Sequence, residues 1–192
     1  MDRMRPTSKD KVLDVGVSEY TFRGTNFLEQ WYPWPGNITA LSNDDPKEFD
    51  DFLKKFPKTN LVFEDGRALS FPDNAFNVVF SNAVVEHVGS RDNQRKFIHE
   101  IVRVSKRAFI STPNRWFPVD AHTLIPFAHW LPVRARFLIF RVLGRGYWAD
   151  LNRLNLLSKK EFVKLFPPHI KLQVYGQKVF GILHSLNAIV EK

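Results

Sequence analysis

The sequence predicts an α/β protein with a doubly wound, mostly parallel sheet of about seven strands. Short apolar runs typical of buried strands alternate with helical segments over residues 11–112. This alternation is typical of right-handed βαβ units, which build a parallel sheet. Two more apolar runs near the carboxyl end, separated by Gly176 and Gly181, predict two closing strands. We therefore expect a single domain over residues 1–192.

The predicted elements are placed by their apolar pattern and by their breakers. Strands are expected at residues 11–15, 37–42, 61–63, 76–81, 107–112, 170–175 and 182–190. Helices are expected at residues 24–31, from 43–46 to before Pro57, at 93–104, and from the capping box 158–161 to before Pro167. Residues 113–157 show no strand pattern, and an insertion of this length is usually functional. We expect this insertion after the fifth strand to contain a helix beginning near Val133 and to form the substrate region.

Composition and charge narrow the classes of function. The 192 residues suffice for one domain with a full core, and they include no cysteine. Disulfides, thiolate metal sites and cysteine nucleophiles are thereby excluded, and a reducing, cytoplasmic compartment is expected. No secretory signal and no apolar run of about 20 residues is apparent. The net charge of +8 fits nucleic acid, anionic lipid or an acidic substrate as partner, or simply a basic solvated surface.

The stretch 11–20 is the first candidate for a ligand site. Asp14 lies within an apolar strand, where a bare carboxylate is costly unless it is hydrogen-bonded. Gly16 ends the strand and permits a tight turn or a close approach to a ligand. In open α/β sheets such a turn forms the crevice that binds nucleosides, although an ordinary strand and loop explain the pattern equally well. Glu19 in this loop would repel a pyrophosphate and suits a cationic ligand, which favours a methyl donor over NAD.

Four stretches in order resemble the class I S-adenosylmethionine-dependent methyltransferases, in their small-molecule, type 11-like branch. They are residues 12–16, 64–72, 76–88 and 103–114. The resemblance implies a Rossmann-like sheet whose terminal strand is antiparallel, and it implies S-adenosylmethionine as cofactor. The sequence departs from the family at Ser18 and Tyr20, where glycines are common. It also departs at Ser42, where an acid usually ends the second strand; Asp44 lies two positions later.

The resemblance also implies which residues contact the cofactor. Asp65 would accept a hydrogen bond from the adenine amino group, although Asp65 and Gly66 also read as a simple turn. The further expected contacts are Gly66, Arg67 and Ala68 at the adenine, Asp14, Gly16, Val17 and Ser18 at the methionine part, Ser42, Asn43 and Asp44 at the ribose, and Ser81, Asn82 and Ala83 beneath the sulfonium. For Asp44, a helix-capping role is an equal alternative.

Methyl transfer is an in-line displacement, so holding donor and acceptor in line supplies much of the catalysis. A general base is needed only for a hydroxyl or a protonated amine. His87 is the first candidate base, Glu86 would orient it or bind the substrate, and His122 is a further candidate. His87 reads equally well as a packing residue. No histidine and acid have a familiar metal spacing, so the sequence predicts no metal site.

The insertion is rich in aromatic residues and arginines. This composition indicates a segment that binds the acceptor or lies against a membrane surface. It suits a small-molecule, glycan-like or lipid-linked acceptor, and residues 115–153 could lie against a membrane. Stacking of nucleobases and a small satellite core are alternatives. The alternatives to an active enzyme of this kind are a catalytically reduced S-adenosylmethionine-binding module and an RNA methyltransferase. Nucleic acid is disfavoured as a partner because an Asn-Pro-Pro-Tyr type of motif is missing, and no oligomeric state is predicted.

Overall fold

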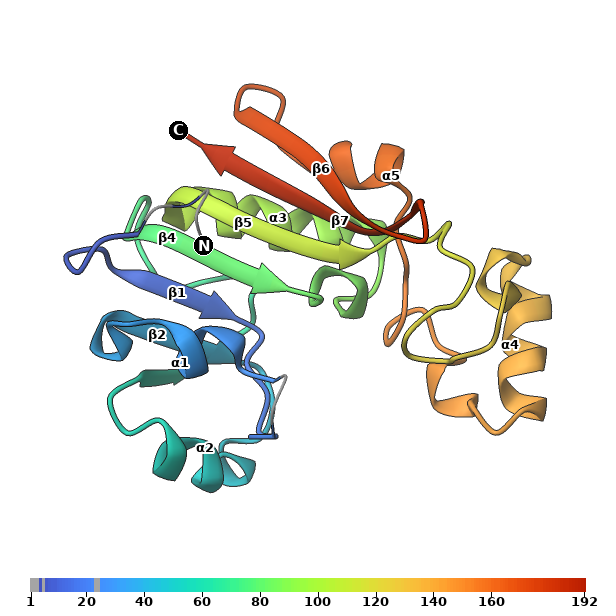
Figure 1. Ribbon diagram of the computed structural model, residues 1–192, viewed down its shortest axis with the longest axis horizontal. Coiled ribbons are helices and arrows are strands. Elements are labelled where there is room, and N and C mark those ends of the chain that lie inside the picture. The colour runs from blue at the N-terminus through green and yellow to red at the C-terminus, as the bar shows by residue number, and fades with distance from the viewer. Residues whose placement is uncertain (1–3, 5, 23–24) are drawn as a thin grey trace.

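Seven strands form one sheet in the order β3-β2-β1-β4-β5-β7-β6 in the computed structural model, which describes residues 4, 6–22 and 25–192 (Figure 1). The strands are β1 (Val12–Val15), β2 (Ile38–Ser42), β3 (Asn60–Phe63), β4 (Phe76–Asn82), β5 (Ser105–Pro113), β6 (Lys171–Val179) and β7 (Ile182–Glu191). Neighbouring strands are parallel except that β7 runs antiparallel to β5 and to β6. The predicted fold class, including an antiparallel strand at the chain end, is confirmed.

The strand order reverses between β1 and β4. The chain moves outward from β1 to β3 and then returns to place β4 on the other side of β1. Val15 pairs with Leu41 of β2 and with Ser81 of β4, so these three strands end at one edge of the sheet. Such a reversal opens a crevice at the carboxyl ends of the strands, which is where open α/β sheets bind ligands.

Helices cover both faces of the sheet (Figure 1). The α-helices are α1 (Phe27–Trp31), α2 (Asp50–Lys55), α3 (Arg91–Val104), α4 (Val133–Val142) and α5 (Lys159–Val163). The 3₁₀ turns are η1 (Pro35–Asn37), η2 (Pro46–Glu48), η3 (Val85–His87), η4 (Ala128–Trp130) and η5 (Gly146–Trp148). The largest core lies between the sheet and α3 with α5, around Phe97, Ile98 and Phe162. Smaller clusters hold α1 and α2 on the opposite face.

The helix starts follow their capping residues. The capping box of Ser158 and Glu161 is present and opens α5 as predicted. The second predicted helix begins instead with η2, which Asp45 caps by accepting a hydrogen bond from the Lys47 amide. The capping role considered for Asp44 is therefore wrong. Of the helix predicted at 24–31, the structure shows Phe27–Trp31, and Gly24 lies outside the described residues.

The alternation of strands and helices pauses between β3 and β4. Residues 64–75 form turns, held by the guanidinium of Arg103. This group donates hydrogen bonds to the carbonyl oxygens of Leu69 and Phe71 and forms ion pairs with Asp73 and Glu100. Glu100 also accepts a hydrogen bond from the Leu69 amide. One arginine on α3 thus holds the connection that follows β3.

The insertion forms a separate lobe beside the sheet, around α4 (Figure 1). Phe140 is buried there with Ala128 and Ala149, and Phe137 and Trp148 pack against them. The satellite core considered for the aromatic residues therefore exists, although it uses only some of them. Among the residues that the structure describes, no helix has the length and apolar character needed to cross a membrane.

Candidate functional site

Two hollows open at the carboxyl edge of the sheet, beside the turn that follows β1. The first has a volume of about 270 Å³ and the second about 170 Å³. The predicted cofactor residues that line the first hollow are Gly16, Ser42, Asn43, Asp65, Gly66 and Arg67. Those that line the second hollow are Asp14, Gly16, Val17, Ser18 and Asn82. The fold thus gathers residues from the ends of four strands around two adjoining spaces.

The other predicted cofactor residues lie outside both linings. They are Asp44, Ala68, Ser81 and Ala83. Asp44 accepts a hydrogen bond from the Ser42 hydroxyl at 3.1 Å, and Ser81 is fully buried. The Ala68 amide donates to the Asp65 carbonyl, so the turn considered for Asp65 and Gly66 is present. Ala83 lines a larger cavity described below.

Gly16 belongs to both linings, and no other residue type fits its position well. Its φ of +92° lies in the left-handed region that favours glycine. A Cβ atom built on Gly16 would also collide with the side chain of Val84, which follows β4. The bare backbone at this point lets the turn after β1 and the turn after β4 approach each other.

Two buried carboxyl groups lie beside the second hollow. Asp14 on β1 and Glu29 on α1 are 5% and 6% exposed, and their carboxyl groups lie close enough to act on each other's pKa. Burial, and then the nearby charge of Glu29, raise the pKa of Asp14 well above its ordinary value. Burial also raises the pKa of Glu29 to about 6. Neither carboxylate oxygen of Glu29 has a hydrogen-bond partner among the described residues, so the pair is suited to a cationic ligand.

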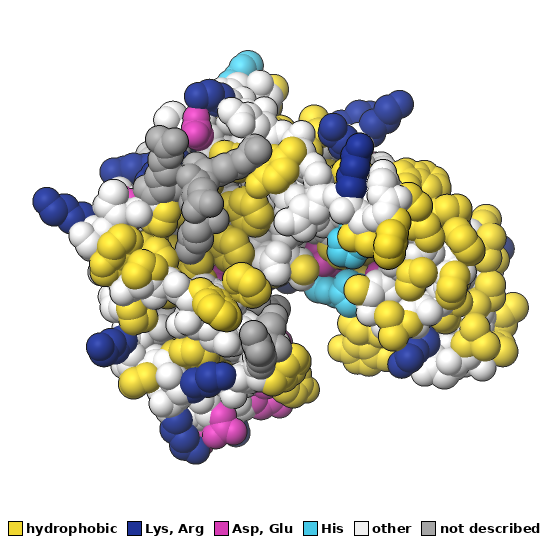
Figure 2. All heavy atoms as spheres, in the orientation of Figure 1, with side chains coloured by type: hydrophobic (Ala, Val, Ile, Leu, Met, Phe, Trp, Pro, Cys, Tyr) yellow, Lys and Arg dark blue, Asp and Glu magenta, His cyan; other side chains and the backbone are white. Residues whose placement is uncertain are grey.

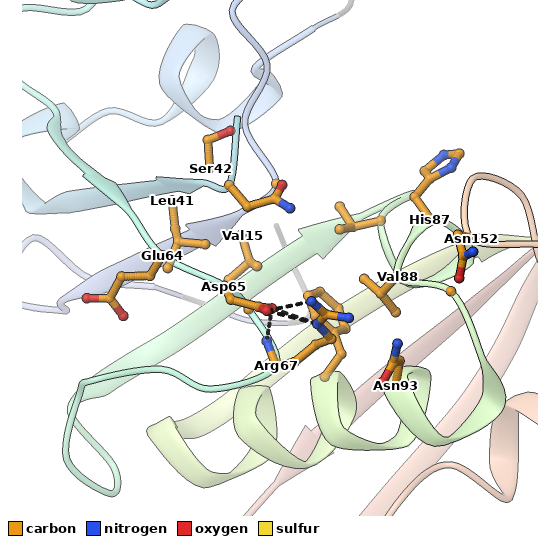
Figure 3. A pocket seen from close by; sticks show the side chains of 16 residues that line it. Val15, Leu41, Ser42, Glu64, Asp65, Arg67, His87, Val88, Asn93 and Asn152 are labelled. Carbon is orange, nitrogen blue, oxygen red and sulfur yellow. Dashed lines mark hydrogen bonds and ion pairs between the residues drawn. The ribbon is translucent and has the colours of Figure 1, made fainter. Parts of the chain in front are cut away.

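Asp65 follows β3 on the floor of the first hollow and is held by Arg67 (Figure 3). The Arg67 guanidinium binds both carboxylate oxygens, at 2.9 Å for Nε to Oδ1 and 2.6 Å for Nη2 to Oδ2. These hydrogen bonds lower the pKa of Asp65 below its ordinary value. In Figure 3, His87 and Asn152 lie across the hollow from Ser42. The hollow therefore has an acidic and polar side and a histidine side.

Three predicted catalytic residues meet at the end of η3, and we name Glu86, His87 and His122 the histidine cluster. The Nε2 atoms of His87 and His122 are 3.1 Å apart, although 35 positions separate the residues in sequence. His122 Nδ1 lies 3.0 Å from Asp120 Oδ1, and His87 Nδ1 lies 2.6 Å from the Arg153 carbonyl oxygen. Glu86 Oε1 lies 3.9 Å from His87 Nε2. The insertion thus supplies one histidine and the partners that orient both rings.

Burial and charge act on the cluster in opposite directions. Burial raises the pKa of Glu86, whose side chain is inaccessible to solvent, despite the opposing charge of His87. Burial also disfavours the charged form of His122, but the hydrogen bond and charge of Asp120 outweigh it and raise the pKa of His122. Glu86 Oε2 accepts a hydrogen bond from the Thr112 hydroxyl at 2.9 Å. The trio is therefore held in place from β5 and from the insertion.

A large cavity lies over the sheet face that carries α1, and we name it the apolar cavity. Its volume is about 1100 Å³. Its aromatic and aliphatic lining residues include Phe27, Leu28, Trp31, Tyr32, Trp34, Phe80 and Phe109. The rings of Phe80 and Phe109 stack on its floor with centroids 5.3 Å apart. Phe80 and Asn82 also line the second hollow, so the cavity adjoins that hollow, and His122 of the histidine cluster lines the cavity.

Comparison with known proteins assigns the family. A family model described as a methyltransferase domain matches residues 13–108, which is half of the chain. The protein belongs to this methyltransferase domain family. Its activity is S-adenosylmethionine-dependent methyl transfer, and its cofactor is S-adenosylmethionine. No curated protein matches the methyltransferase.

Solved structures share the fold of this methyltransferase. An S-adenosylmethionine-dependent methyltransferase from Methanosarcina mazei is 15% identical, with a TM-score of 0.63 over 98% of this chain and 94% of that chain. The YcgJ protein from Bacillus subtilis is 12% identical, with a TM-score of 0.64 over 100% and 95%. A TehB-like S-adenosylmethionine-dependent methyltransferase from Corynebacterium glutamicum is 17% identical, with a TM-score of 0.53 over 100% and 84%. At these identities the likeness concerns the fold alone.

The two hollows fit the chemistry of the methyl donor. S-adenosylmethionine carries a sulfonium and an ammonium cation, and the buried carboxyls of Asp14 and Glu29 lack a described cationic partner beside the second hollow. The polar groups of Ser42 and Asn43 line the first hollow, where a ribose diol can bind them. Asp65 lies in the same hollow, where Arg67 binds both of its carboxylate oxygens and about half of its side chain stays exposed to a ligand.

Several residues of the methyltransferase site carried no recognised signal in the sequence. Glu29 lies within an ordinary helical stretch, and its role follows only from contact with Asp14. Asn26 holds the loop after β1, because its amide binds the Ser18 amide and the carbonyls of Ser18 and Tyr20. Asp120 orients His122 from two positions away. An aspartate this near a histidine in sequence is a local signal that the two side chains pair.

Proposed function

We propose that this methyltransferase transfers the methyl group to a hydroxyl of an acceptor whose body is apolar. One observation carries the proposal. His87 lines the first hollow, His122 lines the apolar cavity, and their Nε2 atoms are 3.1 Å apart. The histidine cluster is therefore the point at which a donor in the hollows and an acceptor in the cavity would meet.

The cluster favours a hydroxyl over an acceptor that is already nucleophilic. When bound, the donor supplies a methyl carbon activated by its sulfonium. A neutral hydroxyl must lose its proton as the new carbon–oxygen bond forms, whereas a neutral amine attacks without prior deprotonation. Two imidazoles and a buried carboxylate at one point provide the site where that proton is removed. Asp120 and the Arg153 carbonyl hold the two rings in position for it.

The cavity favours an apolar small molecule or a lipid-linked acceptor over a glycan. Its lining surface is mainly apolar, and a sugar would leave most of its hydroxyls without partners against the aromatic side chains there. Ser111, Thr112 and Asn187 offer polar groups on the side near the cluster. An acceptor with one hydroxyl end and an apolar body therefore matches the distribution of polar and apolar groups.

A series of alcohols and phenols with lengthening alkyl tails tests this proposal. Each buried methylene contributes about 0.8 kcal/mol, so kcat/KM is expected to rise roughly fourfold per methylene until the cavity is filled. Release of S-adenosylhomocysteine gives the rate, and mass spectrometry identifies the ether product. Trp31→Ala should flatten the length dependence, whereas Trp116→Ala, at an exposed tryptophan outside the cavity lining, should preserve it. Equal rates for short polar and long apolar acceptors would contradict the proposal.

We further propose that the lobe around α4 lies against an anionic membrane surface. Residues 121–149 contain four arginines and no acidic residue. Leu138, Val142, Leu143 and Tyr147 are more than half exposed, and Arg134, Arg141 and Arg145 are exposed among them. Figure 2 shows hydrophobic side chains gathered over the right-hand lobe, where Figure 1 places α4. Exposed apolar groups interspersed with arginines suit the interface of anionic lipid.

Vesicle sedimentation tests the membrane proposal. Binding to vesicles with phosphatidylglycerol should exceed binding to phosphatidylcholine vesicles and should fall as salt is raised. Arg141→Gln should cost about 1 kcal/mol of binding, or roughly fivefold in affinity. Lys96→Gln removes an exposed charge on α3 and should change binding little. Equal losses for the two variants, or equal binding to both kinds of vesicle, would reject this surface.

A further inference from the structure

When both rings of the histidine cluster are neutral, two ring lone pairs face each other. His87 Nδ1 faces the Arg153 carbonyl oxygen at 2.6 Å, and His122 Nδ1 faces a carboxylate oxygen of Asp120 at 3.0 Å. Carbonyl and carboxylate oxygens only accept hydrogen bonds, so each Nδ1 must carry the proton of its ring. In the neutral rings both Nε2 atoms then present lone pairs, and these point at each other across 3.1 Å.

A buried carboxylate oxygen faces the same point. Glu86 Oε1 has no hydrogen-bond partner among the described residues, and the side chain of Glu86 is fully buried. The other oxygen, Oε2, is held by the Thr112 hydroxyl, which fixes the direction of Oε1. A buried oxygen that is left unpaired costs free energy unless something binds it. Three ligand atoms, from Glu86, His87 and His122, thus lie within 4.8 Å of one another.

We propose that Glu86, His87 and His122 form a binding site for a divalent transition-metal ion. The sequence predicted no metal because Glu86 and His87 are remote from His122, and only the fold brings them together. Two metal–nitrogen bonds of about 2.1 Å separate cis ligands by about 3.0–3.4 Å, which matches the spacing of the Nε2 atoms. The Glu86 oxygen stands farther off and would be drawn inward by the ion.

The ligand types and their supports indicate the class of ion. Two imidazoles with one carboxylate suit Zn²⁺, Fe²⁺, Co²⁺ or Mn²⁺ better than Mg²⁺ or Ca²⁺, which prefer oxygen ligands throughout. Metal-binding histidines commonly donate their other ring N–H to a carboxylate or a backbone carbonyl. Asp120 and the Arg153 carbonyl accept these hydrogen bonds here. Three protein ligands leave positions open for water or substrate.

The open positions would lie where the apolar cavity and the first hollow meet. His122 lines the cavity and His87 lines the hollow. A divalent ion lowers the pKa of an oxygen that it binds, so the bound ion would replace the free rings in promoting deprotonation and would let an acceptor hydroxyl lose its proton to solvent near neutral pH. This catalytic role rests on the proposed function, whereas the binding of the ion does not.

Cobalt titration of the chelator-treated full-length protein tests the site. Co²⁺ alone is the probe, because its visible absorption reports nitrogen and oxygen ligation, and calorimetry gives the stoichiometry. We expect one Co²⁺ per chain. His122→Asn and Glu86→Gln should weaken binding more than tenfold, and Asp120→Asn, which removes the charge that orients His122, should weaken it about 10–100-fold. His169→Asn and His99→Asn, on exposed parts of the chain, are the matched controls and should bind normally.

The outcomes separate the site from its catalytic role. No saturable binding of Co²⁺, or equal affinity for Co²⁺ in His122→Asn and His169→Asn, would overturn the site. The short contact between the two rings would then be explained by a proton that they share. Circular dichroism and thermal melting verify that each variant is folded, and His122→Asn, at a partly accessible side chain, serves if Glu86→Gln is unstable.

If Co²⁺ binds but the chelated enzyme methylates alcohols at an unchanged rate, the catalytic role is overturned while the proposed acceptor stands. If Co²⁺ binds and no alcohol is methylated with or without metal, the proposed function fails while the site stands.

Discussion

The carboxyl groups of Asp14 on β1 and Glu29 on α1 are both buried beside the second hollow and lie close enough for each to act on the pKa of the other. Two buried carboxyls this near each other disfavour the state in which both are ionised. Burial raises both pKa values, and the pKa of Glu29 reaches about 6. At least one of these two carboxyls therefore titrates at a higher pH than usual, next to the place proposed for a cationic donor.

The first prediction concerns stability as a function of pH. Folding raises the pKa of Glu29 from 4.5 to about 6, so between these values the folded chain binds more protons than the unfolded chain. The contribution of this group is complete below pH 4.5 and is lost as pH rises through 6. The difference in pKa corresponds to about 2 kcal/mol. Urea unfolding should show Glu29→Gln gaining stability relative to wild type between pH 4.5 and 7, whereas Glu48→Gln, at an exposed site, should not.

The second prediction is that donor binding releases protons. A cationic ligand near Asp14 favours the ionised form of the pair, so bound donor lowers the pKa values that burial has raised. At pH 6, calorimetry in buffers of different ionisation enthalpy should detect protons released on binding S-adenosylmethionine. Glu29→Gln removes the charge that helps to keep Asp14 protonated and should reduce this release. Proton uptake, or a release that Glu29→Gln leaves unchanged, would place the donor's cations elsewhere.

The third prediction separates two reasons for glycine at position 16. Gly16→Ala places a methyl group against Val84 and forces alanine into a φ of +92°. We expect a loss of about 2–4 kcal/mol in the free energy of unfolding, together with weaker donor binding. Val84→Ala in the Gly16→Ala background should recover the steric part and leave about 1 kcal/mol of backbone strain. A double-mutant cycle by denaturant unfolding measures the steric part and the strain part. If the losses in unfolding free energy of the two single variants simply add, the side chain of Val84 can move away from an alanine at position 16 at no cost.

The elements of this fold follow from local patterns, whereas its site depends on contacts between remote segments. Each predicted strand was found because its apolar run is short and bounded by turn residues. The cap at Asp45 was mistaken for Asp44 because adjacent aspartates carry the same propensity. The connection after β3 could not be predicted, since Arg103 holds it from a helix more than 30 positions away. The ring-to-ring contact of His87 and His122 could not be predicted from the local sequence either, because it forms only when the insertion folds back.

The last prediction concerns recognition of adenine by Asp65. The carboxylate of Asp65 is half-exposed and accepts hydrogen bonds from the amide and the guanidinium of Arg67, so the adenine amino group would share this carboxylate with Arg67. Asp65→Ala should weaken the binding of S-adenosylhomocysteine by about 1–3 kcal/mol, the usual cost of removing a hydrogen-bond partner from a polar group. Arg67→Gln removes the guanidinium but keeps the backbone amide that donates to Asp65 Oδ1, and it should change this affinity little, since exposed ion pairs contribute about 1 kcal/mol or less.

A change of ligand shows whether the loss of affinity in Asp65→Ala comes from the contact with the adenine amino group. The inosine analogue of S-adenosylhomocysteine carries an oxygen in place of the amino group, and an oxygen facing Asp65 would be repelled. Wild type should therefore bind the inosine analogue at least tenfold more weakly than S-adenosylhomocysteine, a difference of about 1.4 kcal/mol. Asp65→Ala should bind the two ligands almost equally, because it can neither accept from the amino group nor repel the oxygen. If Asp65→Ala keeps the full discrimination, adenine is read by another group, and Asp65 with Arg67 serves only to hold the turn after β3.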